Sequence, residues 1–129
     1  MIGATTGGVK ALLRIEGACV FLAAAMAYSK FGLGWGTFAV YFLAPDLSFL
    51  GYLAGPSIGA LTYNAAHSYV EAVFTLLAGI LLSAPTLIAA GLIWCAHIGV
   101  DRALGYGLKY FAGFGFTHLG LIGRAKRDA

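Results

Sequence analysis

The chain has 129 residues, of which 60% are hydrophobic and 10% are charged, and its mean hydropathy is +0.87. Soluble domains carry about 25% charged residues, so this composition excludes an ordinary soluble protein and predicts a single integral-membrane domain over 1–129. The net charge of +3 is small, and basic residues do not alternate with aromatic ones on a polar surface. We therefore expect no nucleic-acid partner.

The first half of the chain predicts two membrane-spanning helices. The apolar run that follows the N-terminal polar residues lacks a signal-peptide cleavage site, so we expect a retained helix over 10–29. A tight turn at residue 30 leads into a second helix over 31–50. The uncharged run between Lys30 and Asp46 is shorter than the ~20 residues that a span requires, so this helix must extend past a charged residue.

The second half predicts two more helices, over 62–83 and 85–104, separated by a turn before Pro85. The stretch 51–61, GYLAGPSIGAL, is rich in Gly and Pro and predicts a re-entrant or surface loop. A single kinked helix over 71–101 is the alternative, because Pro is tolerated inside membrane helices. The predicted fold is an all-α membrane protein, a bundle of four transmembrane helices.

The segment 105–123 is rich in Gly and in aromatic residues around Lys109. Frequent Gly argues against a fifth spanning helix, whereas aromatic residues beside a Lys suit the headgroup level of a bilayer. We expect an interfacial segment at one end of the bundle, and leave open whether it is a lid, an interfacial helix or a partner surface.

The basic residues predict the orientation in the membrane. One of the eight Lys and Arg residues, Lys30, lies on the side opposite the chain ends, and the other seven lie on the terminal side. The positive-inside rule therefore predicts a multi-pass protein of the bacterial inner membrane with both termini in the cytoplasm. The expected partners are membrane lipids, and homo-oligomerisation is left open.

Polar side chains gather at the cytoplasmic ends of the predicted helices. Starts of odd-numbered helices and ends of even-numbered helices lie on the same side of the membrane, so eight polar groups fall at one depth. They are Arg14, Glu16, Asp46, Asn64, His67, Glu71, His97 and Asp101. A charge deep in a membrane helix costs about 2.5–3.5 kcal/mol, so such groups normally face one another. The pattern predicts a shared polar pocket, with isolated structural ion pairs as the alternative.

The pocket contains a repeated pairing of imidazole with carboxylate. His67 and Glu71 are four residues apart on one helix, and His97 and Asp101 are four apart on the next. Together with Asp46 they supply the mixed nitrogen and oxygen ligands that Zn, Mn or Fe sites use. We predict a divalent metal held by His67, His97, Asp101 and Asp46.

A metal-dependent hydrolase of a lipid or amphiphile is the first functional hypothesis, since a bound metal lowers the pKa of water toward 7. Its expected catalytic residues are Glu71, Glu16 and Arg14, and its expected substrate-binding residues are Asn64, Tyr63, Arg102, Lys109 and His118. Three alternatives stay open: a small transporter or channel subunit, a haem-binding electron carrier with His67 and His97 as axial ligands, and a structural subunit. Carriers normally keep their sites near the membrane midplane, whereas these groups lie at one end.

Three stretches carry a resemblance to a known family: LLRIEG at 12–17, PDLSFLGYLAGPSIGALTYNAAH at 45–67 and GVDRALGYGLKYFAGFGFTHLG at 99–120. They resemble domain of unknown function family 4260, a family of small bacterial membrane proteins with four predicted helices. The resemblance implies the membrane class and carries no established activity. The residues that match the family pattern are Arg14, Glu16, Asp46, Tyr63, Asn64, His67, Asp101, Arg102, Lys109 and His118.

Overall fold

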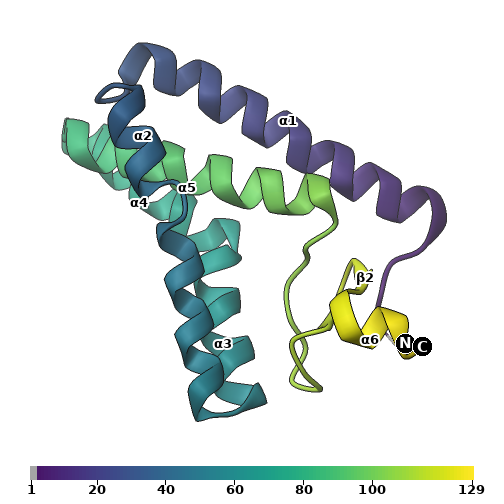
Figure 1. The fold of residues 1–129 in the computed structure, drawn as a ribbon. Helices are drawn as coiled ribbons and strands as arrows, with labels where there is room; N and C mark the ends of the chain where they lie inside the picture. Colours follow the sequence, from purple (N-terminus) through teal and green to yellow (C-terminus); the bar gives the residue numbers. More distant parts are fainter. Residues whose placement is uncertain (1–2) are drawn as a thin grey trace.

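The structure, a computed structural model, describes residues 3–129 and is mostly helical (Figure 1). In chain order the helices are α1 (Gly7–Phe31), α2 (Trp35–Tyr41), the 3-10 helix η1 (Ala44–Ala54), α3 (Pro56–His67), α4 (Tyr69–Leu81), α5 (Pro85–Leu104) and α6 (Gly123–Arg127). A short antiparallel hairpin, β1 (Phe116–Thr117) and β2 (Gly120–Leu121), precedes α6.

The long helices α1 and α5 pack along each other, and α4 packs along α5 (Figure 1). Glycines allow this close approach. A Cβ atom at Gly99 would lie 2.6 Å from the backbone oxygen of Gly17, and one at Gly91 would lie 2.7 Å from the backbone nitrogen of Leu76. Helices that meet at small residues can bring their backbones into contact. α5 is therefore the centre of a three-helix layer.

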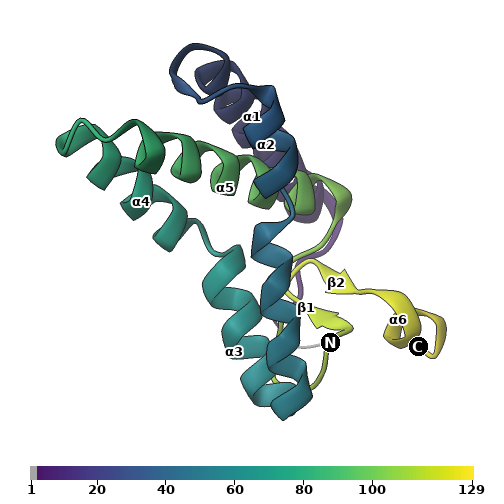
Figure 2. The ribbon, with the colours of Figure 1, turned by 60° about the vertical axis from the view of Figure 1, so that its left-hand side comes forward.

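Two further helices, η1 and α3, form a hairpin that projects steeply from this layer (Figures 1 and 2). The Thr62 hydroxyl of α3 donates to the Ser48 carbonyl of η1 at 3.1 Å. Gly55, with φ of 118°, is the single residue between the two helices. The Gly- and Pro-rich stretch at 51–61, which we expected to be a loop, is thus mostly helical.

The single helix expected over 62–83 is divided at Ser68. Ser68 has extended backbone angles (φ −89°, ψ 144°), and its hydroxyl accepts a hydrogen bond from the Val70 N–H at 3.2 Å. Ser is a favoured N-cap residue because its side chain satisfies a free N–H at a helix start. The break directs α3 toward η1 and α4 toward α5, so the helices are not arranged as the expected bundle of four continuous spans.

Within residues 3–129, three helical stretches are long and apolar enough to cross a membrane: Gly7–Phe31, Trp35–Ala54 and Pro85–Leu104. The last coincides with the helix expected over 85–104, and the first extends the helix expected over 10–29 by a few residues. The kinked-helix alternative over 71–101 is wrong, because a turn with Ser83 at φ 50° separates α4 from α5.

The segment after α5 is largely irregular and folds back against residues 3–5. Gly105, in the left-handed conformation (φ 93°), ends α5. The backbone N–H of Thr5 then donates to the His118 carbonyl at 2.8 Å, and the Tyr110 hydroxyl donates to the Gly3 carbonyl at 2.7 Å. Although glycine-rich, the segment therefore has a defined position against the start of the chain (Figure 1).

Candidate metal centre

Four side chains from three helices meet where the η1–α3 hairpin joins α5. Asp46 lies in the first turn of η1, His67 is the last residue of α3, and His97 and Asp101 are one turn apart on α5. One ligand atom from each lies within 4.8 Å of all the others. The sequence thus predicted correctly that these four residues lie together. We refer to them as the His/Asp cluster.

The ligand atoms of the His/Asp cluster are spaced like the corners of a coordination shell. His67 Nε2 lies 3.1 Å from His97 Nε2 and 3.1 Å from Asp46 Oδ1. His97 Nε2 lies 3.2 Å from the same Asp46 oxygen, and Asp101 Oδ2 lies 3.4 Å from each imidazole nitrogen. In a tetrahedral site with metal–ligand distances of ~2.0–2.1 Å, ligand atoms are about 3.3–3.4 Å apart. These five separations are near that value, and the sixth, between the Asp46 and Asp101 carboxylates, is within 4.8 Å.

The protonation of His67 makes a cation at this point favourable. Its Nδ1 lies 2.9 Å from the Tyr63 carbonyl oxygen, which can only accept a hydrogen bond. In the neutral ring the proton therefore resides on Nδ1, and Nε2 presents a lone pair to the cluster. Metal-binding histidines are commonly oriented in this way by a backbone carbonyl. The lone pair and the two carboxylates of the cluster repel one another unless a proton on His97 Nε2 or a metal cation lies between them.

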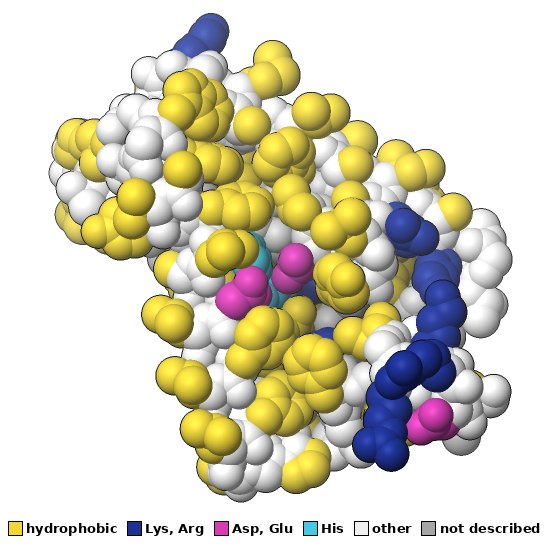
Figure 3. Space-filling model, viewed as in Figure 1, with side chains coloured by type: hydrophobic (Ala, Val, Ile, Leu, Met, Phe, Trp, Pro, Cys, Tyr) yellow, Lys and Arg dark blue, Asp and Glu magenta, His cyan; other side chains and the backbone are white. Residues whose placement is uncertain are grey.

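The His/Asp cluster is buried on the histidine side and open on the carboxylate side. His67 and His97 are 0% and 2% exposed, whereas the side chains of Asp46 and Asp101 are 32% and 17% exposed. Figure 3 shows acidic side chains at the mouth of a recess, with histidine behind them and hydrophobic side chains around the rim. A small molecule can therefore approach the cluster from the carboxylate side.

Neighbouring residues fix the position of His67. The Tyr63 ring stacks on its imidazole at 3.8 Å between centroids, with an interplanar angle of 7°. Arg102 of α5 is buried and donates through Nη2 to the His67 carbonyl at 2.6 Å. Trp94 donates through Nε1 to the Ala66 carbonyl at 2.5 Å. Two side chains of α5 thus hold the last turn of α3 beside the cluster.

The three residues expected to be catalytic lie outside the His/Asp cluster. Arg14 is exposed and donates through Nε to the Ala103 carbonyl at 2.9 Å. Glu16 is exposed on α1 and lines a separate cleft that also includes Arg102. Glu71 lies on α4, beyond the break at residue 68, and its buried Oε2 has no hydrogen-bond partner within 3–129.

The residues expected to bind substrate mainly hold the C-terminal segment. The Asn64 side chain forms two hydrogen bonds with the backbone of Lys109, accepting from its N–H at 2.6 Å and donating to its carbonyl at 2.8 Å. His118 accepts from the Leu108 N–H through Nδ1 at 2.9 Å. Tyr63 and Arg102 support His67 as described above. The ammonium of Lys109 is the exception, because it lies among aromatic rings.

Aromatic residues that the sequence did not single out lie beside Tyr63 and His67. Phe49 stacks on Tyr63 with centroids 5.3 Å apart, and Phe114 lies 5.5 Å from Phe49. Phe49 follows Asp46 by three residues, which places both on one face of a 3-10 helix. That signal is visible in the sequence, because residues three apart also share one face of an α-helix.

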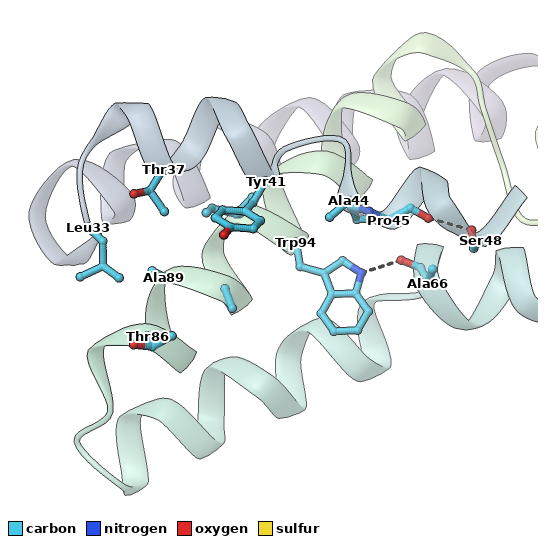
Figure 4. A pocket seen from close by; sticks show the side chains of 12 residues that line it. Leu33, Thr37, Tyr41, Ala44, Pro45, Ser48, Ala66, Thr86, Ala89 and Trp94 are labelled. Atoms are coloured by element: carbon cyan, nitrogen blue, oxygen red, sulfur yellow. Dashed lines mark hydrogen bonds between the residues drawn. The ribbon is translucent and has the colours of Figure 1, made fainter. Parts of the chain in front are cut away.

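An apolar cavity of about 720 Å³ lies on another face of η1, beside the His/Asp cluster (Figure 4). Its walls come from α2, η1, α3 and α5. Pro45 and Ala66, the chain neighbours of two cluster residues, are at one end, and Leu33 and Thr86 are at the other (Figure 4). Trp94 forms part of its wall beside Ala66.

The cluster geometry disfavours haem. Axial ligands on opposite sides of one metal ion with bonds of ~2.0–2.1 Å have nitrogen atoms about 4 Å apart. The Nε2 atoms of His67 and His97 are 3.1 Å apart, and both face the same carboxylates. This spacing fits adjacent ligands of one ion and leaves no room for a porphyrin plane between the two rings.

Comparison with known proteins gives one family. The model of a domain of unknown function (DUF4260) matches residues 10–122, a range that includes the whole His/Asp cluster. No curated protein and no solved structure matches the chain.

Proposed function

The chain belongs to the DUF4260 family, a domain of unknown function, and we propose that it is an integral-membrane metalloprotein. The His/Asp cluster binds one divalent ion, Zn, Mn or Fe, and the ion serves the hydrolysis of an amphiphile at the cytoplasmic leaflet. The observation that carries this proposal is the set of five ligand–ligand separations between 3.1 and 3.4 Å.

Membrane insertion is supported by the helices themselves. Three helical stretches have the length and hydropathy of a span, and large apolar side chains cover the surface. Leu53 and Leu81, for example, are 87% and 83% exposed. Exposed apolar surface on this scale is normal where lipid is the solvent. We place both termini in the cytoplasm on the basis of the unequal distribution of Lys and Arg.

Hydrolysis is the chemistry that this ligand set suits best. Nitrogen and carboxylate ligands without thiolate are typical of metal sites that activate water. A catalytic site needs a position that water can occupy, and the exposed carboxylate side of the cluster provides access to one. Asp46 is the more exposed of the two carboxylates and comes from a different helix. We propose that Asp46 would leave the ion and accept the proton of the attacking water, with His67, His97 and Asp101 remaining as the three protein ligands of a catalytic site.

An amphiphilic substrate is supported by two neighbouring features. The recess at the cluster has an apolar rim (Figure 3). The apolar cavity beside η1 is lined by Pro45 and Ala66, which directly precede the cluster residues Asp46 and His67 in the sequence (Figure 4). A polar group at the cluster would thus have apolar surface around it.

The distribution of buried charge favours an enzyme over a carrier. Within the described part of the chain, the buried ionisable side chains other than Cys and Tyr are His67, His97, Arg102 and Lys109, all at or near the cluster. A carrier needs polar groups near the midplane or along a path across the membrane.

Metal analysis of the purified full-length protein tests the proposal. We expect about one divalent ion per chain by elemental analysis, with no Soret absorbance. His97→Gln should lose most of the metal, because one imidazole ligand is removed. His118→Gln is the matched control and should keep it. Metal-free protein in which the four side chains bond only to one another would overturn the proposal.

A further inference from the structure

We infer that Lys109 and the metal ion of the His/Asp cluster together bind one phosphate group of the substrate. This inference rests on the proposed metal centre and extends it to the class of substrate. The residues that carry it are Lys109, the two aromatic rings that enclose its ammonium, and Asn64.

The Lys109 ammonium is enclosed beside the cluster. It lies 3.8 Å from the centroid of the Phe114 ring and 4.8 Å from the centroid of the Tyr63 ring. The Tyr63 ring in turn stacks on His67 at 3.8 Å. The distance from the ammonium to the His67 ring centroid is therefore at most the sum of the ammonium–Tyr63 and Tyr63–His67 distances. Basic side-chain atoms are visible in the recess below the acidic side chains in Figure 3.

The Lys109 side chain is largely buried, but its ammonium still reaches water. Lys109 is 3% exposed, and its Nζ forms no hydrogen bond or ion pair within residues 3–129. Cation–π contacts stabilise an ammonium by roughly 0.5–2 kcal/mol, depending on its desolvation, and they supply no hydrogen-bond acceptor. The three N–H donors have no acceptor in the described chain, and an oxyanion would supply one.

The position of Lys109 is fixed through its backbone. The paired hydrogen bonds with Asn64 hold both its N–H and its carbonyl against α3, one turn before His67. Lys109 also forms an isolated β-bridge with Thr117. The ammonium is thus held in a defined place relative to the cluster, as a ligand-binding group requires.

Other basic residues near the cluster are already engaged. Arg102 donates to two backbone carbonyls, those of His67 and Tyr106. Arg14 donates to the Ala103 carbonyl and is exposed. Among the residues that the structure describes, Lys109 is therefore the buried cation that remains free to bind an anion.

Charge balance makes the binding depend on the metal. Asp46 and Asp101 neutralise a divalent ion, so the loaded cluster together with the Lys109 ammonium has a net positive charge. Without the metal the two carboxylates balance the charges of Lys109 and Arg102, and an anion loses its metal ligand. In the proposed complex a phosphate directs one oxygen to the metal and another to the ammonium, since Lys is a common phosphate-binding residue.

Paramagnetic broadening provides a test that does not require turnover. The full-length protein in detergent is loaded with Mn²⁺, and the ³¹P line width of inorganic phosphate is followed as phosphate is titrated. We expect saturable broadening that is absent from metal-free protein. Lys109→Met should weaken phosphate binding about tenfold or more at unchanged Mn²⁺ content, because an ionic hydrogen bond is lost.

Two further variants control the test. Lys126→Met, at an exposed position on α6, should leave phosphate affinity unchanged, and Lys109→Arg should restore part of it. Equal phosphate affinity in the Lys109→Met variant and the native protein, at full Mn²⁺ loading, would overturn this inference and leave the metal centre standing. Failure to bind Mn²⁺ at all would overturn the proposed function and this inference with it.

The same experiment separates the two sources of phosphate. Dihexanoyl phosphatidic acid is titrated in parallel with inorganic phosphate. Tighter binding of the lipid, with the same dependence on Lys109, identifies a phospholipid headgroup. Equal affinities identify a water-soluble phosphate ester. Lipid binding that is insensitive to both Mn²⁺ and Lys109 would count against the inference.

Discussion

The charge of Lys109 serves the proposed binding of phosphate, but burying that charge lowers the stability of the folded protein. Burial lowers the pKa of its ammonium from 10.5 to about 8, and the nearby Asp101 offsets only part of this effect. The unfolded chain keeps the proton up to about pH 10.4, whereas the folded chain releases it near pH 8. Between these values the unfolded state binds more protons, so stability rises with pH. Below pH 8 the full cost of the buried charge is present.

Lys109→Met should therefore stabilise the metal-free, phosphate-free protein at pH 7. We expect a gain of roughly 1–3 kcal/mol from removal of the buried charge, measured by thermal unfolding in detergent. The gain should shrink as the pH is raised from 8 to 10, because the native lysine then loses its charge. A Lys109→Met variant that is less stable than the native protein across this range would contradict this assignment.

The four cluster residues could be predicted from sequence because each lies near an end of its predicted helix on the same side. The expected catalytic role of Glu71 had a different basis, its position one helical turn after His67. The break at Ser68 removes that relation, since α4 starts in a new direction. Hydrogen bonds such as those of Asn64 to Lys109 could not be foreseen, because they depend on how an irregular segment folds back.

Among the helices, α5 was the most predictable. A Pro begins it and a Gly ends it, and both are strong local signals. The division between α3 and α4 was missed because the apolar run continues through it and a Ser is tolerated inside helices. The end of η1 and the start of α3 were missed because Gly and Pro in 51–61 indicate loops in most contexts. Here the glycines allow η1 and α3 to lie close together, and the chain turns between them at Gly55.

The contact between α1 and α5 gives a prediction at this scale. Gly99→Ala should destabilise the protein by about 1–3 kcal/mol, because the new Cβ would lie 2.6 Å from the Gly17 backbone oxygen and force the helices apart. Gly36→Ala is the control, since its Cβ would meet nothing within 4 Å on the exposed α2. Thermal unfolding in detergent compares the two. Equal melting temperatures would show that α1 and α5 do not pack at these glycines.

For the whole molecule, composition was sufficient to predict an apolar, mostly helical protein, and it was insufficient to predict the packing. The projecting η1–α3 hairpin brings Asp46 and His67 to α5 from one side. A metal ion at the cluster would thus connect the hairpin to the three-helix layer. Sequence periodicity could not show this, because apolar residues occur on all faces of these helices and mark no single buried side.

Orientation in the membrane is testable with cysteine labelling in intact cells. In a background without the exposed Cys19, a cysteine at Ser83, in the turn between α4 and α5, should react with a membrane-impermeant maleimide. A cysteine at Asp128 should react only after the membrane is permeabilised, because the basic chain ends are expected in the cytoplasm. The reverse pattern would place the cluster at the outer face.

The proposed function depends on one metal ion that is bound by two imidazoles and two carboxylates. X-ray absorption at the edge of the bound metal tests it most directly, because it reports ligand type and distance together. We expect nitrogen and oxygen ligands at about 2.0–2.1 Å, with the more distant scattering of two imidazole rings. A ligand set containing sulfur, or one of oxygen atoms without imidazole scattering, would contradict the His/Asp cluster as the metal centre.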